Sequence, residues 1–404
     1  MRRVVITGVG VVSAIGVNTA EFWAALSAGR SGIDWITKVD VSNMRFQKAA
    51  EVKGFDAATL FDEKLLFWLD PFAQYGIAAA REAVADSGIE FTAELKDNSG
   101  VITGSCLGGK PTEDEQYRKL YAEGKERQPP GAIPKVMANA VASHVSMEFG
   151  LTGATFTTST ACSSANHAIG QAFWLIRQGT LDAAIAGGSE APICNGHLRA
   201  WETMRVVSPD TCRPFSKDRS GMVLGEGGAM FVMETLESAQ ARGAKIYAEI
   251  AGFGMSADAH HLTMPLAAGA SKAMRGALKD ANLSPEQIGY VNAHGTATQA
   301  NDSMETEAIK LTFGDHAKTL PVSSTKSMHG HTLGAAGAIE SAATVLALHN
   351  SLLPPTANFN EVDPECDLDV IPNEARPAKV EAAISNSFAF GGLNAVLAFK
   401  TWRG

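Results

Sequence analysis

Cysteine is scarce in this sequence, and the five residues present are scattered. They stand at positions 106, 162, 194, 212 and 366, an odd number without a Cys-x-x-Cys pair. This spacing argues against a disulfide framework and against a zinc ribbon. We therefore expect a protein of a reducing, cytoplasmic compartment.

Long runs of one residue type are also missing. No cluster of Lys or Arg stands out and the net charge is −9, so a nucleic-acid partner is not expected. No uncharged apolar stretch reaches the ~18 residues of a membrane helix. The opening "MRRVVITGVGVVSAIG" has the arginines of a signal peptide, but its apolar run is β-branched and broken by Gly and Thr. We interpret it as a buried strand followed by a glycine loop, in a soluble protein.

Short apolar runs alternate with Ala-rich segments of helical length through the first half of the chain. The predicted strands are 2–12, 99–106, 181–191 and 227–236, and the predicted helices are 71–88 and 163–179. Continuous apolar strands between helices predict an α/β fold with a buried, largely parallel sheet covered on both faces.

The second half begins the pattern again. A strand and loop over 246–261 are followed by helix, turn and strand over 270–296, by strand, glycine-rich loop and helix over 320–351, and by two strands over 381–399. We interpret this as a duplicated βαβ unit with its seam near Gly243.

The predicted duplication divides the chain into halves 1–244 and 245–404, packed as one body. The loop before Cys162 then corresponds to the loop of His329 and His331. Ligands bind beyond the carboxyl ends of such strands, so both loops are expected to face one cleft.

Cys162 stands where the polar "TFTTST" gives way to a helical pattern. The apolar stripe of that pattern consists of Ile169, Ala172, Phe173 and Ile176. Cys162 therefore falls at or just before the first turn, where free N–H groups and the helix dipole favour a thiolate. We expect its pKa to be brought toward neutrality there. Cysteine is also a common small core residue, so position alone leaves a nucleophile and a packing residue both open.

Two later segments carry histidines on predicted loops. His294, in "NAHGTATQAND", follows an apolar strand, where catalytic residues gather, although a loop histidine can also cap backbone groups. "STKSMHGHTLGAAG" offers Lys326, His329 and His331 before a Gly- and Ala-rich helix, on which Glu340 can turn inward to hold a cation or an imidazole. The His-x-His pair is an unconvincing metal site, because no carboxylate or thiol lies at ligand spacing.

Two glycine-rich segments remain. "NSFAFGGLN" (386–394) is consistent with ordinary packing, or with an aromatic gate whose backbone N–H groups serve an oxyanion. "GVGVVS" (8–13) lacks the third glycine of a dinucleotide fingerprint, so NAD is not expected.

The segments "TACSSA", "NAHGTATQAND", "STKSMHGH" and "NSFAFGG" occur in this order, together with "CRPFSKDRSGMVLGEGG" and "AIAGGSEA". The set resembles the elongating β-ketoacyl-acyl carrier protein synthases and the related ketosynthases of polyketide assembly, from about residue 2 to about residue 400. The resemblance implies a thiolase-type fold of two similar βαβαβ halves in five α-β-α-β-α layers, usually as a dimer. It also implies a cytoplasmic acyltransferase without metal or cofactor, since phosphopantetheine arrives on the acyl carrier protein.

The resemblance also assigns roles to residues. Cys162 is implied as the acylated nucleophile, His294 and His331 as the paired histidines, and Lys326 and Glu340 as their support. Phe388 and Phe390 match the gate, and the backbone N–H groups of Cys162 and Phe390 match the oxyanion hole. Thr296 and Thr298 match residues that contact the phosphopantetheine arm. The implied reaction is a decarboxylating Claisen condensation of acyl and malonyl thioesters in fatty acid or polyketide elongation.

Some segments depart from the family pattern. "FDEKLLFWLD" (61–70) is acidic and then apolar where the family is commonly basic for carrier docking, and Lys64 is its only base. The apolar part, 65–68, is either a helix core face or a partner interface. Arg205 matches a docking arginine, whereas His329 stands where the family usually has threonine.

Other functions are considered beside a homodimeric condensing enzyme. A thiolase-like acyltransferase is disfavoured, because thiolases resemble a Cys/His/Cys arrangement. A non-catalytic chain-length factor lacks the nucleophile that Cys162 supplies. The chain can still be the active member of a heterodimer with such a factor, in a specialised polyketide, polyene or nodulation-type pathway.

Overall fold

Ten strands form one continuous sheet in the computed structural model, which describes all residues 1–404. The strand order is β10-β9-β13-β14-β8-β1-β7-β6-β4-β5. The strands of the N-terminal half are β1 (Val4–Ser13), β4 (Ser99–Gly104), β5 (Thr155–Thr158), β6 (Ala183–Glu190) and β7 (Gly227–Thr235). Those of the C-terminal half are β8 (Ala248–Ala257), β9 (Ile288–Asn292), β10 (Val322–Ser323), β13 (Ala382–Ala389) and β14 (Leu393–Thr401). The sheet is therefore two groups of five strands, joined where β1 pairs with β8.

The sheet is mixed, so the expectation of a largely parallel sheet is wrong. β1–β7, β1–β8, β6–β7, β8–β14 and β13–β14 are antiparallel, whereas β4–β5, β4–β6, β9–β10 and β9–β13 are parallel. β1 is buried along its whole length although both of its neighbours are antiparallel to it. Its continuous apolar sequence reflects cover on both faces, which strand direction does not determine.

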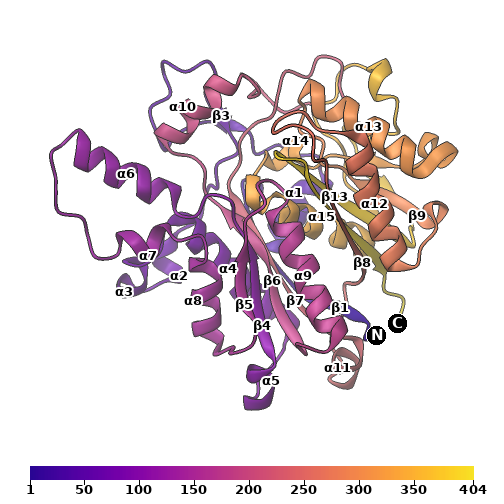
Figure 1. Cartoon of the computed structure of the whole chain (residues 1–404), viewed down its shortest axis with the longest axis horizontal. Helices are drawn as coiled ribbons and strands as arrows, with labels where there is room; N and C mark the ends of the chain where they lie inside the picture. Colours follow the sequence, from indigo (N-terminus) through magenta and orange to yellow (C-terminus); the bar gives the residue numbers. More distant parts are fainter.

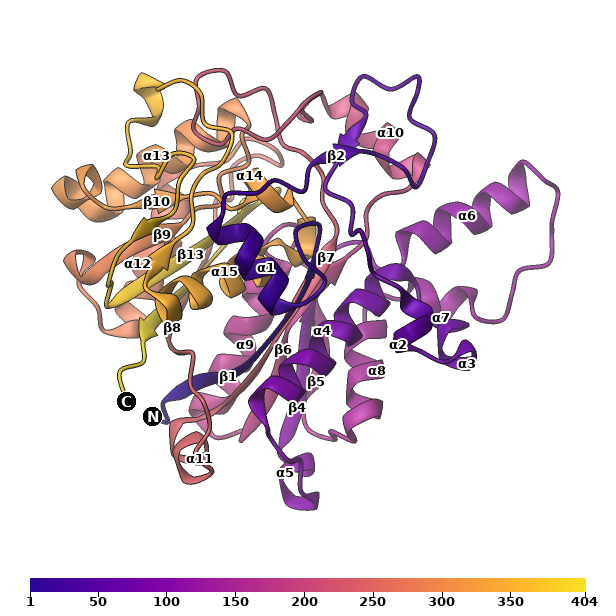
Figure 2. The ribbon, with the colours of Figure 1, turned by 180° about the vertical axis from the view of Figure 1, so that it is seen from behind.

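Helices cover the two groups of strands in the five-layered α-β-α-β-α arrangement that the family resemblance implies (Figures 1 and 2). α4 (Pro71–Ser87) and α8 (Ala140–Phe149) lie against the N-terminal strands, and α12 (Ala267–Ala281) and α13 (Gln299–Phe313) cover the C-terminal ones. α9 (Ser164–Gln178) and α15 (Ala336–Asn350) contact strands of both groups, so they form the middle layer. α15 is buried from Ala336 to Leu348, as its Gly- and Ala-rich sequence permits.

Shorter elements surround this core. The remaining helices are α1 (Thr19–Ser27), α2 (Ala57–Leu60), α3 (Glu63–Leu66), α5 (Ala93–Asp97), α6 (Lys110–Tyr121), α7 (Ala132–Val136), α10 (Asn195–Met204), α11 (Leu236–Ala241) and α14 (Lys326–His329). β2 (Asp34–Trp35) pairs with β3 (Lys48–Ala49), and β11 (Leu352–Leu353) pairs with β12 (Arg376–Pro377). No helix has both the length and the apolar sequence needed to cross a bilayer.

The predicted seam falls between α11 and β8, where Gly243 has a φ of 66°. α9 and α4 end where the sequence predicts, each at a left-handed glycine, Gly179 and Gly88. The segment before α15 differs from the expected loop, because Lys326–His329 forms a helical turn. Strand-end loops of both halves thereby meet beside the head of α9.

Candidate active site

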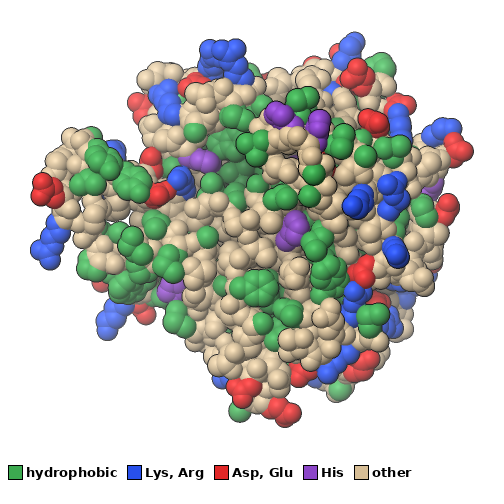
Figure 3. All heavy atoms as spheres, in the orientation of Figure 1, with side chains coloured by type: hydrophobic (Ala, Val, Ile, Leu, Met, Phe, Trp, Pro, Cys, Tyr) green, Lys and Arg blue, Asp and Glu red, His purple; other side chains and the backbone are tan.

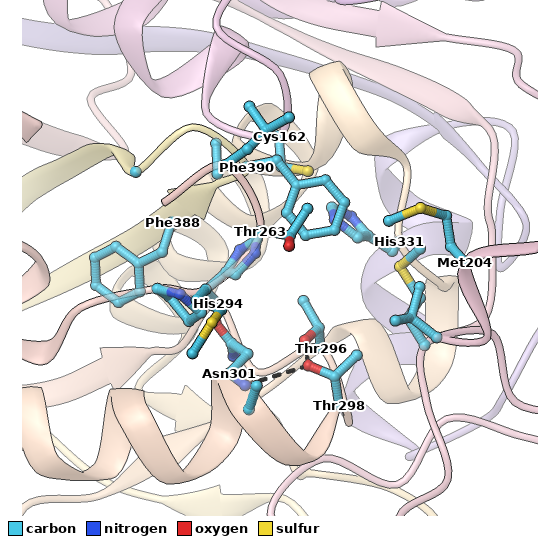
Figure 4. A pocket seen from close by; sticks show the side chains of 18 of the residues that line it. Cys162, Met204, Thr263, His294, Thr296, Thr298, Asn301, His331, Phe388 and Phe390 are labelled. Atoms are coloured by element: carbon cyan, nitrogen blue, oxygen red, sulfur yellow. Dashed lines mark hydrogen bonds between the residues drawn. The ribbon is translucent and has the colours of Figure 1, made fainter. Parts of the chain in front are cut away.

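A pocket of about 220 Å³ opens beside the head of α9 (Figure 4). Cys162, His294 and His331 all line it, together with Phe388 and Phe390. The two halves of the chain therefore contribute to one cleft, as the corresponding loops predict. The rest of the lining is mostly apolar or small and consists of Trp201, Met204, Val206, Met222, His261, Leu262, Thr263, Met264, Pro265, Thr296, Thr298, Ala300, Asn301, Ala389 and Gly392.

Cys162 lies two residues before α9, and only 8% of it is exposed. Ala161 has a φ of 49°, so the chain turns sharply there and presents Cys162 at the head of the helix. Burial raises the pKa of the thiol to about 11, although Lys326 and the backbone N–H of Phe390 act to lower it. The expected shift toward neutrality is therefore wrong for the unliganded pocket, because desolvation of the thiolate outweighs the local positive charge.

His294 follows β9 and is held by Lys326. The Lys326 ammonium lies 3.3 Å from His294 Nδ1 and donates to the His294 carbonyl at 2.6 Å. Nδ1 is therefore the acceptor nitrogen, and the ring proton resides on Nε2. Burial, with Lys326 and His331 acting in the same direction, holds the pKa of His294 well below its usual value. His294 is a neutral imidazole with an N–H donor in the pocket.

His331 has the same tautomer for a different reason. Its Nδ1 accepts the backbone N–H of Leu333 at 3.3 Å, which leaves the proton on Nε2. Burial and the Lys326 charge lower its pKa well below the usual value. Two neutral imidazoles from separate loops therefore offer N–H donors to the same space.

Lys326 and Glu340 form an ion pair, and neither side chain has any exposed surface. Glu340 comes from α15 and turns inward, as the sequence predicts. Burial raises the pKa of the Glu340 carboxyl and the lysine opposes that shift. The Lys326 ammonium thus lies beside His294 and acts on Cys162, and the Glu340 carboxylate offsets its charge.

Two carboxylates that the sequence interpretation missed support the His294 loop. Glu305 accepts the backbone N–H groups of His294 at 2.8 Å and Gly295 at 2.7 Å, and Asn386 donates to it at 3.1 Å. Asp302 accepts the N–H groups of Phe215 at 2.7 Å and Ala297 at 3.2 Å. Both carboxylates are buried on α13. Their signal in the sequence is the acidic run that follows "NAHGTATQ".

Thr296 and Thr298 both line the pocket, and their hydroxyls lie 2.9 Å apart. Thr298 also accepts the N–H of Asn301 at 3.3 Å as the cap of α13. The two hydroxyls form a polar strip on a largely apolar wall, suited to the amide groups of an extended chain.

Phe390 lies in the turn between β13 and β14. Its backbone N–H acts to lower the pKa of the Cys162 thiol, and its ring lies 6.1 Å from that of Trp201. The turn is made by Gly391 and Gly392, at φ 84° and 67°. Phe388 is buried, with its ring 6.1 Å from that of His294.

His329 is directed away from this chemistry. Its ring nitrogens pair with the Gly330 carbonyl at 2.8 Å and the Thr325 hydroxyl at 3.0 Å, and burial lowers its pKa to about 3. It stabilises the bend after α14, while His331 faces the pocket. No group of three or more His, Cys, Asp or Glu side chains has metal-binding geometry.

The two residues expected to dock a carrier protein, Arg205 and Lys64, lie apart. Arg205 follows Met204, which lines the pocket, and is exposed at the end of α10. Lys64 is on α3, which both ribbon views place at an edge of the molecule away from α13 and α14. In the adjoining apolar stretch, Leu65 and Leu66 pack partly against the core, whereas Phe67 and Trp68 are 45% and 39% exposed.

Comparisons with known proteins find family models and relatives that match most of the chain. The family model "Beta-ketoacyl synthase, N-terminal domain" matches residues 1–239, and "Beta-ketoacyl synthase, C-terminal domain" matches residues 247–360. Nodulation protein E of Rhizobium sp. (strain N33) is 48% identical over 399 residues, 99% of each chain. The 3-oxoacyl-[acyl-carrier-protein] synthase 2 of Coxiella burnetii (strain RSA 493 / Nine Mile phase I) is 46% identical over 404 residues, 98% of each chain.

Solved structures show the same similarity. The ishigamide ketosynthase/chain length factor superposes with a TM-score of 0.95 at 38% identity, covering 100% of both chains. AntDE:AntF, a type II PKS acyl-carrier protein in complex with its ketosynthase, superposes with a TM-score of 0.89 at 31% identity, again over 100% of both chains.

Proposed function

The chain belongs to the β-ketoacyl synthase family, and on that premise we propose how its residues carry out the reaction and in which kind of pathway. The protein is an acyltransferase of the 3-oxoacyl-acyl carrier protein synthase type. Such an enzyme joins an acyl group to a malonyl-derived carbon by decarboxylative Claisen condensation. The proposal concerns the residues, the partners and the acyl chain.

The first half-reaction is acyl transfer to Cys162. Its sulfur attacks the carbonyl carbon of an acyl thioester, and the departing thiolate of the carrier takes up the thiol proton. The backbone N–H groups of Cys162 and Phe390 bind the tetrahedral oxyanion. Burial raises the pKa of the free thiol, so the resting thiol is largely protonated near neutral pH and has to give up its proton for acyl transfer.

The second half-reaction uses the two histidines. A malonyl thioester loses CO₂, and the electron pair of the broken bond forms an enolate at the thioester oxygen. The Nε2–H groups of His294 and His331 stabilise that oxygen, and the enolate carbon then attacks the acyl-Cys162. The product is a 3-oxoacyl thioester, and the Cys162 thiolate takes up a proton.

One observation carries this proposal: both imidazoles are neutral and both have Nδ1 engaged, at Lys326 and at the Leu333 N–H. Donors of this kind suit a developing oxyanion. The electron pair never leaves the substrate, so we propose a reaction without a metal or redox group.

An acyl carrier protein is the proposed partner. Thr296 and Thr298 contact the phosphopantetheine arm that it brings, and Arg205 at the pocket rim contacts the acidic carrier. The AntDE:AntF structure supports this partner, because there a related ketosynthase binds an acyl-carrier protein. The free, scattered cysteines fit the reducing cytoplasm in which we propose that the enzyme works.

We also propose that the protein is a dimer that joins at strand β5. β5 is the last strand of the sheet, and its Phe156 is 37% exposed. Hydrophobic side chains gather over α6 and α7 (Figure 3). The exposed large apolar residues on or next to α3, α6, α7 and α8 are Phe67, Trp68, Tyr117, Tyr121, Ile133, Met137 and Met147. An open strand edge beside apolar surface is suited to pairing with a second copy or with a chain-length factor.

The proposed pathway is a specialised one of the nodulation type, with a narrow choice of acyl chain. The relatives named Nodulation protein E, at 46–48% identity over 99% of this chain, support it, as does the ishigamide neighbour. Carrier proteins loaded with C2 to C16 chains test both the condensing activity and the proposed choice of acyl chain. Mass spectrometry of the intact protein identifies which chains acylate Cys162, and added malonyl carrier protein must then give 3-oxoacyl product. Broad long-chain use would point instead to general fatty acid synthesis.

A further inference from the structure

Trp201 and His197 form a hydrogen-bonded pair on one face of α10. The indole N–H of Trp201 donates to His197 Nε2 at 2.7 Å, one helical turn earlier. The two rings cross at 85° with centroids 6.0 Å apart. Trp201 lines the pocket, whereas His197 lies behind Trp201 and is not itself part of the lining.

The histidine is well suited to accept this bond. Burial, chiefly, lowers the pKa of His197 to about 4, with Lys110 acting in the same direction and Asp114 against it. Its ring is therefore neutral, with the lone pair on Nε2 and the proton on Nδ1. Asp114 also accepts the backbone N–H of Gly196 at 3.1 Å, which fixes the start of α10 against α6.

The indole also lies beside the ring of Phe390, and it lines the same pocket as Cys162. Trp201 packs against the same apolar cluster as Cys162, which includes Leu198, Leu333 and Ala389. Its ring lies 6.1 Å from that of Phe390 at an angle of 31°. Phe390 and Cys162 line the same pocket, and the backbone N–H of Phe390 acts to lower the pKa of the Cys162 thiol. The orientation of the indole therefore affects the position of the Phe390 ring and the width of the pocket that Cys162 also lines.

We propose that His197 is a positioning residue for substrate choice: by accepting the indole N–H of Trp201 it fixes the apolar wall beside Phe390 and so limits which acyl groups Cys162 takes up. This inference rests on the proposed role of Cys162 as the acyl-carrying nucleophile. The indole N–H of Trp201 is partly buried and needs an acceptor, so loss of His197 releases the ring from its present orientation. A displaced wall changes the fit of each methylene of the acyl chain, and such differences are worth ~10–200-fold in selectivity.

Four variants of the whole protein test the inference. His197→Leu removes the acceptor, His197→Gln retains an acceptor oxygen, Trp201→Phe removes the donor, and the double variant His197→Leu/Trp201→Phe lacks both. The readout is the ratio of Cys162 acylation rates for short and long acyl carrier thioesters, from C4 to C16, measured by intact mass. Thermal unfolding of each variant establishes that it is folded.

His197→Leu and Trp201→Phe are each expected to shift that ratio by about tenfold or more, and His197→Gln to retain most of the wild-type ratio. In the Trp201→Phe background, His197→Leu is expected to add nothing, because the donor is already absent. An unchanged ratio in folded His197→Leu, or a full further shift in the double variant, overturns the inference. Absence of acylation in the wild type overturns the proposed role of Cys162 and this inference with it, whereas normal acylation with unchanged ratios overturns this inference alone.

Discussion

The imidazole rings of His294 and His331 meet edge to face, with centroids 5.4 Å apart and planes at 84°. One ring follows a strand and the other follows a helical turn, and 36 residues separate them in the chain. Each has its Nδ1 occupied by a different donor, so both present Nε2–H. In the proposed mechanism the pair therefore acts on the enolate oxygen as two separate hydrogen-bond donors, and neither ring has to bind a proton.

Replacing either histidine by alanine is expected to separate the two half-reactions. His294→Ala and His331→Ala each remove one donor from the enolate oxygen, which typically lowers a rate by about 10²–10³-fold. Decarboxylation of malonyl carrier protein, measured as CO₂ release, is expected to fall by that amount, whereas self-acylation of Cys162 is expected to fall much less. Equal losses in both steps would contradict the proposed division of labour.

Alkylation of Cys162 is expected to be slow at pH 7 and to accelerate with pH. The thiolate is the nucleophile, and a pKa of about 11 leaves little of it near neutrality. The rate of labelling by iodoacetamide is therefore expected to rise about tenfold per pH unit up to pH 10. Peptide mapping by mass spectrometry identifies which cysteine is labelled, and Cys162→Ala is the control. A plateau near pH 7 would mean that the helix terminus outweighs burial, and preferred labelling of Cys106 or Cys194 would refute the assignment.

At the head of α9, local sequence predicts the position of Cys162 but not the pKa of its thiol. The helical stripe, the terminal glycine and the position of Cys162 all follow from local pattern, and the structure has them. The pKa of the thiol does not follow, because it depends on how deeply β13 and α15 bury the sulfur. Local sequence determines which turn a residue occupies, whereas desolvation depends on the whole fold.

Similar reasoning explains the other differences. Apolar strands indicate cover on both faces, and β1 has that cover with antiparallel neighbours, so strand direction was predicted wrongly. Glu305 and Asp302 act through backbone N–H groups of the His294 loop, a contact without a spacing rule in the sequence. Lys64 is separated from Arg205 because α3 lies at an edge that sequence order does not specify.

The buried ion pair is expected to matter for stability only when it is broken on one side. Glu340→Leu leaves the Lys326 ammonium without its carboxylate partner in a site without solvent, and removal of one partner of such a pair typically lowers the free energy of unfolding by about 3–5 kcal/mol. Urea unfolding measures the change.

The double variant Lys326→Met/Glu340→Leu is the matched control, because it replaces both charges by apolar groups. We expect it to recover most of the lost stability and to remain inactive in condensation, since the charge beside His294 is gone. Equal destabilisation of the single and double variants would show that packing, and not charge, is the cause.

Thr296→Val is expected to weaken binding of carrier-linked substrates. It removes one hydroxyl of the polar strip and keeps the shape of the side chain, so KM for malonyl carrier protein is expected to rise severalfold while iodoacetamide labelling of Cys162 stays unchanged. Thr298→Val also removes the cap of α13, which typically costs about 1 kcal/mol of stability. Thr298→Ser retains the cap and is the control. A fall in kcat without a change in KM would contradict a binding role.

Gly392→Ala is expected to impair acyl transfer through the backbone of the gate. Gly392 has a φ of 67°, and a Cβ there would lie 2.5 Å from the Cβ of Asp258, so the turn has to shift. That shift displaces the N–H of Phe390 from the oxyanion, and loss of one donor lowers the rate of Cys162 acylation by about 10²–10³-fold. Stopped acylation reactions analysed by intact mass give the rate.

Gly243→Ala is the matched control for the strain itself. Gly243 has a φ of 66°, and a Cβ there would meet nothing within 4 Å, so this variant carries the same backbone penalty far from the pocket. It is expected to lower the melting temperature slightly and to leave the acylation rate unchanged. If both variants acylate at the wild-type rate, the Phe390 N–H does not bind the oxyanion. If both slow equally, general destabilisation explains the effect, because the two glycines share a φ value and differ only in what surrounds them.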